Sequence, residues 1–180
     1  MSSQSPLASL LTRASVGPKY LTAPGPDRKT VENFAALLSG APCHDDTFPV
    51  RLVVVENREA LGRAFVSALP ADATEEERKK ALRKAEKGPV CFALILEESP
   101  DVLRRARDEK LLSAGAVLMR LLDAVHAAGF AAKTVSAKDL PDPQGLYDPT
   151  RETLLAFVLC GTLVPEAKRS PRRPVSITYF

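Results

Sequence analysis

Several residue types are scarce in this chain, and each scarcity removes a class of protein. The 180 residues contain no tryptophan, seven phenylalanines and three tyrosines, and no run interleaves aromatic residues with lysine or arginine. Proteins that bind single-stranded nucleic acid rely on stacking aromatics set among basic side chains, so we expect no nucleic-acid partner. The formal net charge of +3 is too small to indicate a polyanionic partner by itself.

Cysteine is also scarce, with three residues in the chain. Cys91 and Cys160 lie in apolar runs and are predicted to be buried thiols, which suits the reducing cytoplasm. Residues 43–46, CHDD, have the side-chain types of metal ligands. Neighbouring residues rarely form a ligand set alone, and the sequence holds no second such cluster, so we expect no metal site.

Secretory and membrane segments are missing or weak. The first residues, MSSQSPLASLLTR, lack the basic start and long apolar core of a signal peptide. The longest apolar stretch, Leu111 to Phe130, has the length of a membrane span, but Arg120, Asp123 and His126 would be costly in hydrocarbon. Arg120 and Asp123 are spaced to pair on one helix face. We therefore predict no membrane partner, and a helix buried on every side as the central pillar of a compact domain, where a second subunit could share it.

The rest of the chain mixes helical and strand patterns within one predicted domain, residues 1–180. Apolar β-branched runs predict strands at 51–56, 90–96, 131–135 and 154–161. Apolar spacing predicts further helices at 7–12, 28–38, 58–69 and 75–87, with Asp27 as the cap of the second and Thr74 at the start of the fourth. A long arm then leads to a strand-like run, 175–180, which could reach another subunit. The fold class predicted is α+β: a mixed, mainly antiparallel sheet flanked by helices, with swapped C-terminal tails in a homodimer.

Four local patterns occur in a fixed order along the chain. They are LLTRAS at 10–15; APCH at 41–44 with a proline before the next strand; SAG at 113–115 on a helix ending in AAGF; and LCGT at 159–162 followed by a basic arm and SITYF. In this order and spacing they resemble the small stand-alone branch of the nitroreductase family over nearly the whole chain. That resemblance implies an α+β homodimer with FMN at each subunit interface.

The resemblance also assigns residues to the flavin. An FMN site needs cations and N–H groups for the phosphate and polar groups for the ring, while the cofactor carries the chemistry, so no catalytic acid–base side chain is expected. Arg13 and Ser15 would hold phosphate, His44 would lie beside the flavin and the partner subunit, and residues 134–136 would face the ring. The full set implied for cofactor binding is Arg13, Ala14, Ser15, Gly40, His44, Thr134, Val135, Ser136 and Arg172.

Plainer interpretations stand beside these assignments. Arg13 could be a solvated residue at a helix end, His44 a surface loop residue, and the KRSPRR segment at 168–173 a solvated arm. Departures from the family pattern favour these plainer interpretations. Ala14 and Gly40 stand where arginines are common, residues 48–50 read Phe-Pro-Val instead of Gln-Pro-Trp, and residues 134–136 read Thr-Val-Ser instead of Trp-Arg-Ser.

Two flavin-directed arginines of the family pattern, at positions 40 and 135, are therefore missing. A hydrogen bond to a charged group contributes about 1.5–3 kcal/mol, so losing two would weaken FMN binding by about 10²–10⁴-fold unless other residues replace them. Arg172 is the replacement we predict at the phosphate. The basic residues considered for this role are Lys133, Lys168, Arg169, Arg172 and Arg173.

Three functions remain open at this point. The first is an FMN-dependent oxidoreductase that takes hydride from NAD(P)H and reduces a small flat aromatic acceptor, such as a nitroaromatic or a quinone, in ping-pong order. The second is a relative that binds flavin weakly or not at all and serves as a ligand-binding module on the same dimer. The third is a structural dimer whose interface is its function.

Overall fold

The computed structural model describes residues 12–43, 48–98, 106–137, 140–168 and 175–179. The helix predicted at 7–12 falls outside these residues except for Thr12, which is helical. The predicted site residues His44 and Arg172 also lie outside them.

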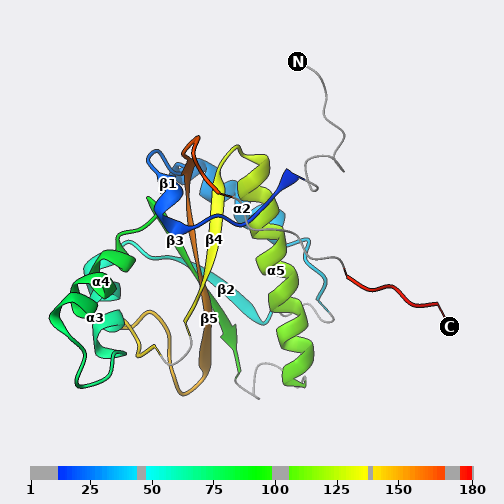
Figure 1. Cartoon of the computed structure of the whole chain (residues 1–180). Helices are drawn as coiled ribbons and strands as arrows, with labels where there is room; N and C mark the ends of the chain where they lie inside the picture. The colour runs from blue at the N-terminus through cyan, green and yellow to red at the C-terminus, as the bar shows by residue number, and fades with distance from the viewer. Residues whose placement is uncertain (1–11, 44–47, 99–105, 138–139, 169–174, 180) are drawn as a thin grey trace.

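A five-stranded antiparallel sheet forms the centre of the described part of the chain (Figure 1). Its strands are β1 (Leu21–Thr22), β2 (Val50–Val54), β3 (Val90–Glu97), β4 (Ala131–Ser136) and β5 (Glu152–Leu163). The long strand β5 pairs with β3, β4 and β1, and β2 pairs with β3. Val158 of β5 lies opposite Phe92 of β3 and Thr134 of β4, so these three strands share one register. The α+β class and the antiparallel sheet predicted from sequence are confirmed.

Helices cover both faces of this sheet (Figure 1). The helices are α2 (Arg28–Leu38), α3 (Arg58–Ser67), α4 (Glu75–Ala85) and α5 (Arg107–Ala127), with a short 3-10 helix η1 (Pro18–Tyr20). Phe34 of α2 and Leu121 of α5 pack on one face with Phe92, whereas Leu61 and Phe65 of α3 pack on the other. Two hydrophobic cores therefore lie back to back, separated by the sheet.

The predicted helix starts are confirmed by their caps. The Asp27 side chain accepts a hydrogen bond from the backbone N–H of Thr30 at 2.8 Å, and Asn57 caps α3 in the same way. Thr74 and Glu77 form a reciprocal capping box at the start of α4. Residues 17–26 have the composition of a Pro/Gly-rich arm, which favours irregular structure, yet this segment contains η1 and β1.

The prediction that the apolar helix is buried on every side is wrong for a single chain. α5 buries Val117, Leu121 and Val125 against the sheet, but Leu112 is 76% exposed and Met119 is 42% exposed. Only one stripe of a helix can touch a flat sheet, and in the described structure nothing else covers the opposite stripe. No helix among the described residues combines the length and the apolar character that a bilayer crossing requires.

The predicted pair between Arg120 and Asp123 does not form. Arg120 Nε donates to the carbonyl oxygen of Leu37 at 2.9 Å, and Asp123 instead forms an ion pair with Arg13 at 3.4 Å. Both partners come from segments distant in sequence that pack beside α5. Tertiary contacts therefore replace the local pair that helix spacing favours.

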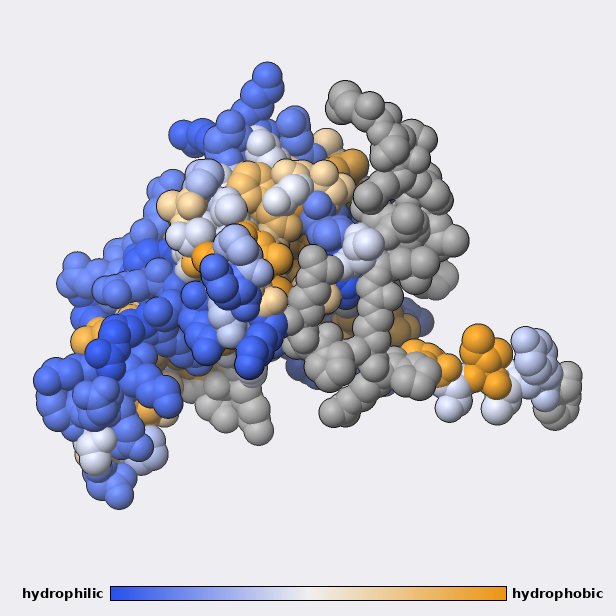
Figure 2. Space-filling view, turned by 45° about the horizontal axis from the view of Figure 1, so that its top comes forward, coloured by the Kyte–Doolittle hydropathy of each residue, from blue (hydrophilic) through white to orange (hydrophobic). Residues whose placement is uncertain are grey.

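The C-terminal segment also differs from the prediction. Residues 175–179 form no strand, and Val175, Ile177 and Tyr179 are 87%, 77% and 96% exposed. The segment stands away from the body of the molecule and carries hydrophobic surface (Figure 2). An extended run with apolar residues at every second position is able to form a strand only when another strand edge meets it.

A methyl group at Gly161 should destabilise the fold. A Cβ there would lie 2.8 Å from the carbonyl oxygen of Thr22 and 2.6 Å from Cδ of Pro89, where β1 meets β5. We expect Gly161→Ala to lower the free energy of unfolding by about 1–3 kcal/mol, measured by urea denaturation. Gly17→Ala is the matched control, because its Cβ would meet only ordinary contacts at 3.4 Å. Equal stability of the two variants would contradict this account of the β1–β5 contact.

The ion pair between Arg51 and Glu152 should make stability depend on acid. Arg51 Nη2 donates to Glu152 Oε2 at 2.7 Å, and this contact lowers the pKa of the Glu152 carboxyl below its ordinary value of 4.5. The folded chain then binds fewer protons than the unfolded chain, so this stabilisation is present above the unfolded pKa and is lost as pH falls through the folded pKa.

Glu152→Gln should therefore lose less stability than the parent chain when urea denaturation is repeated from pH 6 down to pH 3. Glu86→Gln, changed at an exposed position, serves as the control and should keep the parent profile. A Glu152→Gln profile that superimposes on the parent profile would remove this role of the ion pair.

Candidate functional site

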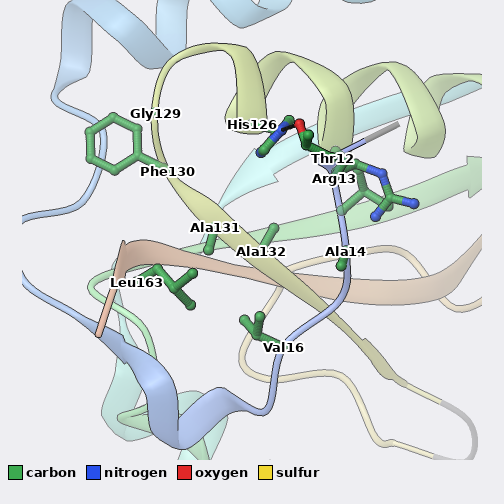
Figure 3. Close-up of a pocket in the computed structure, with 11 residues that line it drawn as sticks. Thr12, Arg13, Ala14, Val16, His126, Gly129, Phe130, Ala131, Ala132 and Leu163 are labelled. Atoms are coloured by element: carbon green, nitrogen blue, oxygen red, sulfur yellow. Dashed lines mark hydrogen bonds between the residues drawn. The ribbon is translucent and has the colours of Figure 1, made fainter. Parts of the chain in front are cut away.

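A cavity of about 190 Å³ lies where the N-terminal segment passes the end of α5 and the start of β4 (Figure 3). Its lining comes from Thr12, Arg13 and Ala14 on one side and from Leu122 and His126 of α5 on another. Residues 129–132, which lead from α5 into β4, form a further wall, and Leu163 at the end of β5 also lines the cavity. Three segments far apart in the sequence therefore meet here: the N-terminal segment, the stretch from α5 into β4, and the end of β5.

Two polar contacts attach the N-terminal segment to α5. Thr12 Oγ1 and His126 Nε2 lie 3.0 Å apart within hydrogen-bonding distance, and their side chains point toward each other (Figure 3). Arg13 Nε lies 3.4 Å from Asp123 Oδ1, and the two side chains are 25% and 28% exposed. This Oδ1 atom is buried and has no hydrogen-bond partner in the structure, so the contact is a charge pair without a hydrogen bond.

Small residues keep the cavity open toward the sheet. Ala131 and Ala132 follow the turn at Gly129, whose φ of +85° is a backbone conformation that favours glycine. Alanine side chains at the start of β4 leave space above the strand that larger residues would fill. The sequence predicted β4 and a flavin-facing role for residues 134–136, but it gave Ala131 and Ala132 no role in a site.

The predicted residues fall in three places. Arg13 and Ala14 line the cavity, and Ser15 follows them as a half-buried residue. Residues 134–136 lie farther along β4, where Thr134 is opposite Val158. Gly40 lies away from the cavity, just beyond the end of α2. Of the proposed replacements for missing arginines, Lys133 is half-buried on β4 and Lys168 is exposed, whereas residues 169, 172 and 173 are outside the described ranges.

An arginine from another element occupies the space beside Gly40. A Cβ at Gly40 would lie 2.7 Å from Nη2 of Arg120, whose Nε donates to the carbonyl oxygen of Leu37. A bulky side chain at position 40 would therefore compete with Arg120 for the same space. The guanidinium at this end of α2 is supplied by α5 instead of by residue 40.

Thr12, Asp123 and His126 are the polar residues of this site that sequence reasoning missed. Their partners lie more than one hundred positions away, so no local spacing could have indicated the contacts. The signal that was available is the LLTR segment itself, because a basic residue at the end of an apolar helix needs a partner when it becomes half-buried.

The buried thiols take no part in this site. Burial raises the pKa of Cys91 to about 11 and that of Cys160 to about 12, so both stay protonated at neutral pH. Both are fully buried, as predicted from their apolar surroundings. Among residues that the structure describes, no group of three or more metal-ligating side chains comes together.

The donors at this cavity suit the phosphate end of FMN. Arg13 supplies a guanidinium, Thr12 a hydroxyl and His126 an imidazole. The carboxylate of Asp123 also offsets part of the charge on Arg13. The volume is below the roughly 300–1,000 Å³ of typical ligand pockets, so the flavin ring would need surface beyond this cavity.

The fold that holds this cavity is nitroreductase-like: an antiparallel sheet between helices with one long helix against it, shared with solved nitroreductase family proteins over nearly the whole chain. This confirms the fold expected from the four sequence patterns. No protein-family model matches the sequence, and no curated protein matches it significantly.

The likeness to particular structures is extensive in coverage and low in identity. A nitroreductase-like family protein from Bacillus cereus is 18% identical, with a TM-score of 0.76 over 99% of this chain and 98% of that one. A protein from Desulfovibrio desulfuricans, assigned as a nitroreductase and solved in complex with FMN, is 18% identical, with a TM-score of 0.71 over 97% and 94%. An FMN-dependent nitroreductase from Clostridium difficile is 12% identical, with a TM-score of 0.62 over 97% and 99%. At these identities the likeness establishes the fold alone.

Proposed function

We propose that this chain is an FMN-dependent oxidoreductase of nitroreductase type that uses NAD(P)H as hydride donor. The observation that carries the proposal is the cavity in which Arg13 meets the end of α5 and the start of β4, within a nitroreductase-like fold. When bound, FMN would supply the redox chemistry, namely hydride uptake from the dinucleotide and reduction of a flat acceptor such as a nitroaromatic or a quinone.

The chain's own residues bind and orient the cofactor in this proposal. Arg13, with Ser15 and the Thr12 hydroxyl, holds the phosphate, and Arg172 of the C-terminal arm adds a second cation there. The backbone of residues 134–136 faces the ring. Because the cofactor is the reactive group, affinity and orientation are what these residues contribute to the rate.

We further propose that the working form is a homodimer. The uncovered stripe of α5 carries Leu112 and Met119 with Gly115 between them, and apart from the backbone of α5 itself no atom of the described residues lies within 4 Å of a Cβ placed on Gly115. A second copy packed on this stripe would remove apolar surface from water and bring a helix close to Gly115. The exposed apolar residues of the C-terminal segment would then have a partner subunit to contact.

The compartment we propose is the cytoplasm, where thiols such as Cys91 and Cys160 stay reduced.

A second function is favoured by one specific contact. Asp123 lies against Arg13 and offsets the charge that a phosphate would need, and residues 40 and 134–136 carry no arginine. A dimer that binds flavin weakly, or binds another flat ligand, would follow from this. The absorbance spectrum of freshly purified protein separates the two: flavin bands before or after addition of FMN support the oxidoreductase, and colourless protein that gains no bound flavin supports the alternative.

The charge pair at the cavity should control FMN affinity. Arg13→Gln removes the guanidinium and should weaken FMN binding by about 10–100-fold, the range expected for one charge-assisted hydrogen bond. Asp123→Asn removes the competing carboxylate and should tighten binding. Both are measured by quenching of flavin fluorescence. Arg63→Gln, an exposed ion-paired arginine on α3, is the control. Unchanged affinity in Arg13→Gln would exclude this cavity as the phosphate site.

The dimer should depend on the uncovered stripe of α5. Leu112→Lys places a charge on that stripe and should shift the protein from dimer to monomer in sedimentation velocity, raising the dissociation constant at least about tenfold. Leu82→Lys on α4 is the control, because Leu82 is 43% exposed on a different helix. A parent chain that sediments as a monomer at micromolar concentration would refute the homodimer.

A further inference from the structure

A groove of about 530 Å³ lies along α4, separate from the cavity at Arg13. Its apolar lining comes from Phe65 of α3, Leu69 just after that helix, Ala81 of α4 and Pro18 of η1. Its volume falls within the roughly 300–1,000 Å³ of small-molecule sites. The groove is thus large enough for one half of a dinucleotide.

The rim of the groove is strongly basic. Lys80, Lys84 and Lys87 are spaced along one face of α4 and its C-terminal end, and no ion pair in the described part of the chain involves any of them. Arg83 also lines the groove but pairs with Glu76. The one lining carboxylate, Glu77, accepts hydrogen bonds from Thr74 in the capping box. The groove therefore keeps a net positive charge, although the ionised Glu77 carboxylate offsets part of it.

The floor and the rim suit different parts of one ligand. Lys84 Nζ lies 4.4 Å from the centre of the Phe65 ring, so this rim cation is held over the aromatic side chain of the floor. An apolar floor favours a flat heterocycle, and the ammonium groups above it favour phosphate. Together these features match a phosphorylated nucleotide better than a neutral aromatic compound.

The groove adjoins the strand assigned to the flavin ring. Phe65 and Lys84 share a small gap with Val135 of β4, so the base of the groove lies on the sheet face beneath that residue. α3 and α4 stand on the opposite side of the molecule from α5 (Figure 1). A dimer formed through the uncovered stripe of α5 would consequently leave the groove accessible.

We propose that this groove binds the phosphate-bearing adenosine half of the reducing dinucleotide and thereby favours NADPH over NADH. The proposal rests on the oxidoreductase function, because it assigns the donor that such an enzyme would use. The adenine lies on the apolar floor, and Lys84 and Lys87 contact the 2′-phosphate that distinguishes the two dinucleotides. The positive rim stabilises bound NADPH more than bound NADH, because NADPH carries the larger negative charge.

The direct test is calorimetric titration of the full chain with 2′,5′-ADP, with adenosine 5′-monophosphate as the comparison ligand. The parent chain should bind 2′,5′-ADP at least about tenfold more tightly. A Lys84→Gln/Lys87→Gln variant should lose about tenfold in that affinity, as expected for the loss of phosphate contacts. Lys79→Gln is the matched control, because Lys79 lies on the same helix, pairs with Glu75 and does not line the groove.

The outcomes separate this inference from the proposed function. Binding of 2′,5′-ADP requires no flavin, so a chain that binds it but not FMN would keep the nucleotide groove and lose the oxidoreductase. Equal affinity for the two ligands would overturn the proposal that the groove recognises the 2′-phosphate. An equal loss of affinity in the Lys79→Gln control would overturn it as well. Thermal melting of each variant verifies folding. If flavin binds, the ratio of kcat/KM for NADPH to that for NADH should also fall about tenfold in the double variant and stay unchanged in Lys79→Gln.

Discussion

Pairing of β5 on both of its edges is the interaction on which the remaining structure depends. β3 lies along one edge, β4 meets the other, and the buried residues Phe157 and Val158 point into the two separate cores. Each core packs its own helices against this strand, so neither helix layer would have a surface to cover without it. The same strand brings the start of β4 to the cavity, because its register places Ala132 opposite Cys160.

The sequence was informative wherever structure is decided by near neighbours. Strand runs such as VCFALIL and caps such as Asp27 and Thr74 predicted elements to within a few residues, because periodicity and capping act over one or two turns. The two residues of β1 were missed, since their strand character comes from pairing with β5 and not from local preference. The sequence of so short a segment does not indicate that it pairs with a distant strand.

In the candidate site, too, features set by near neighbours in the sequence could be predicted, and contacts with distant residues could not. The segment at Arg13 could be selected by its resemblance to a family pattern, but its contact with Asp123 could not, because Asp123 is more than one hundred residues away in the sequence. Helix spacing suggested Arg120 as the partner of Asp123, whereas packing against α2 gave Arg120 a carbonyl oxygen and the space beside Gly40. The elements that pack beside a helix determine the partners of its charged residues. The sequence of the helix alone does not show which elements these are.

Two of the three cysteines are deeply buried, and this burial determines how an oxidoreductase built on this fold would respond to oxidants. Protonated, inaccessible sulfur atoms resist oxidants such as peroxide, because oxidation requires a thiolate that the reagent can reach. Cys43, which is half-buried, is therefore the position at which a thiol-specific label would attach first. A spectroscopic probe placed there would report on the loop after α2 while leaving both cores intact.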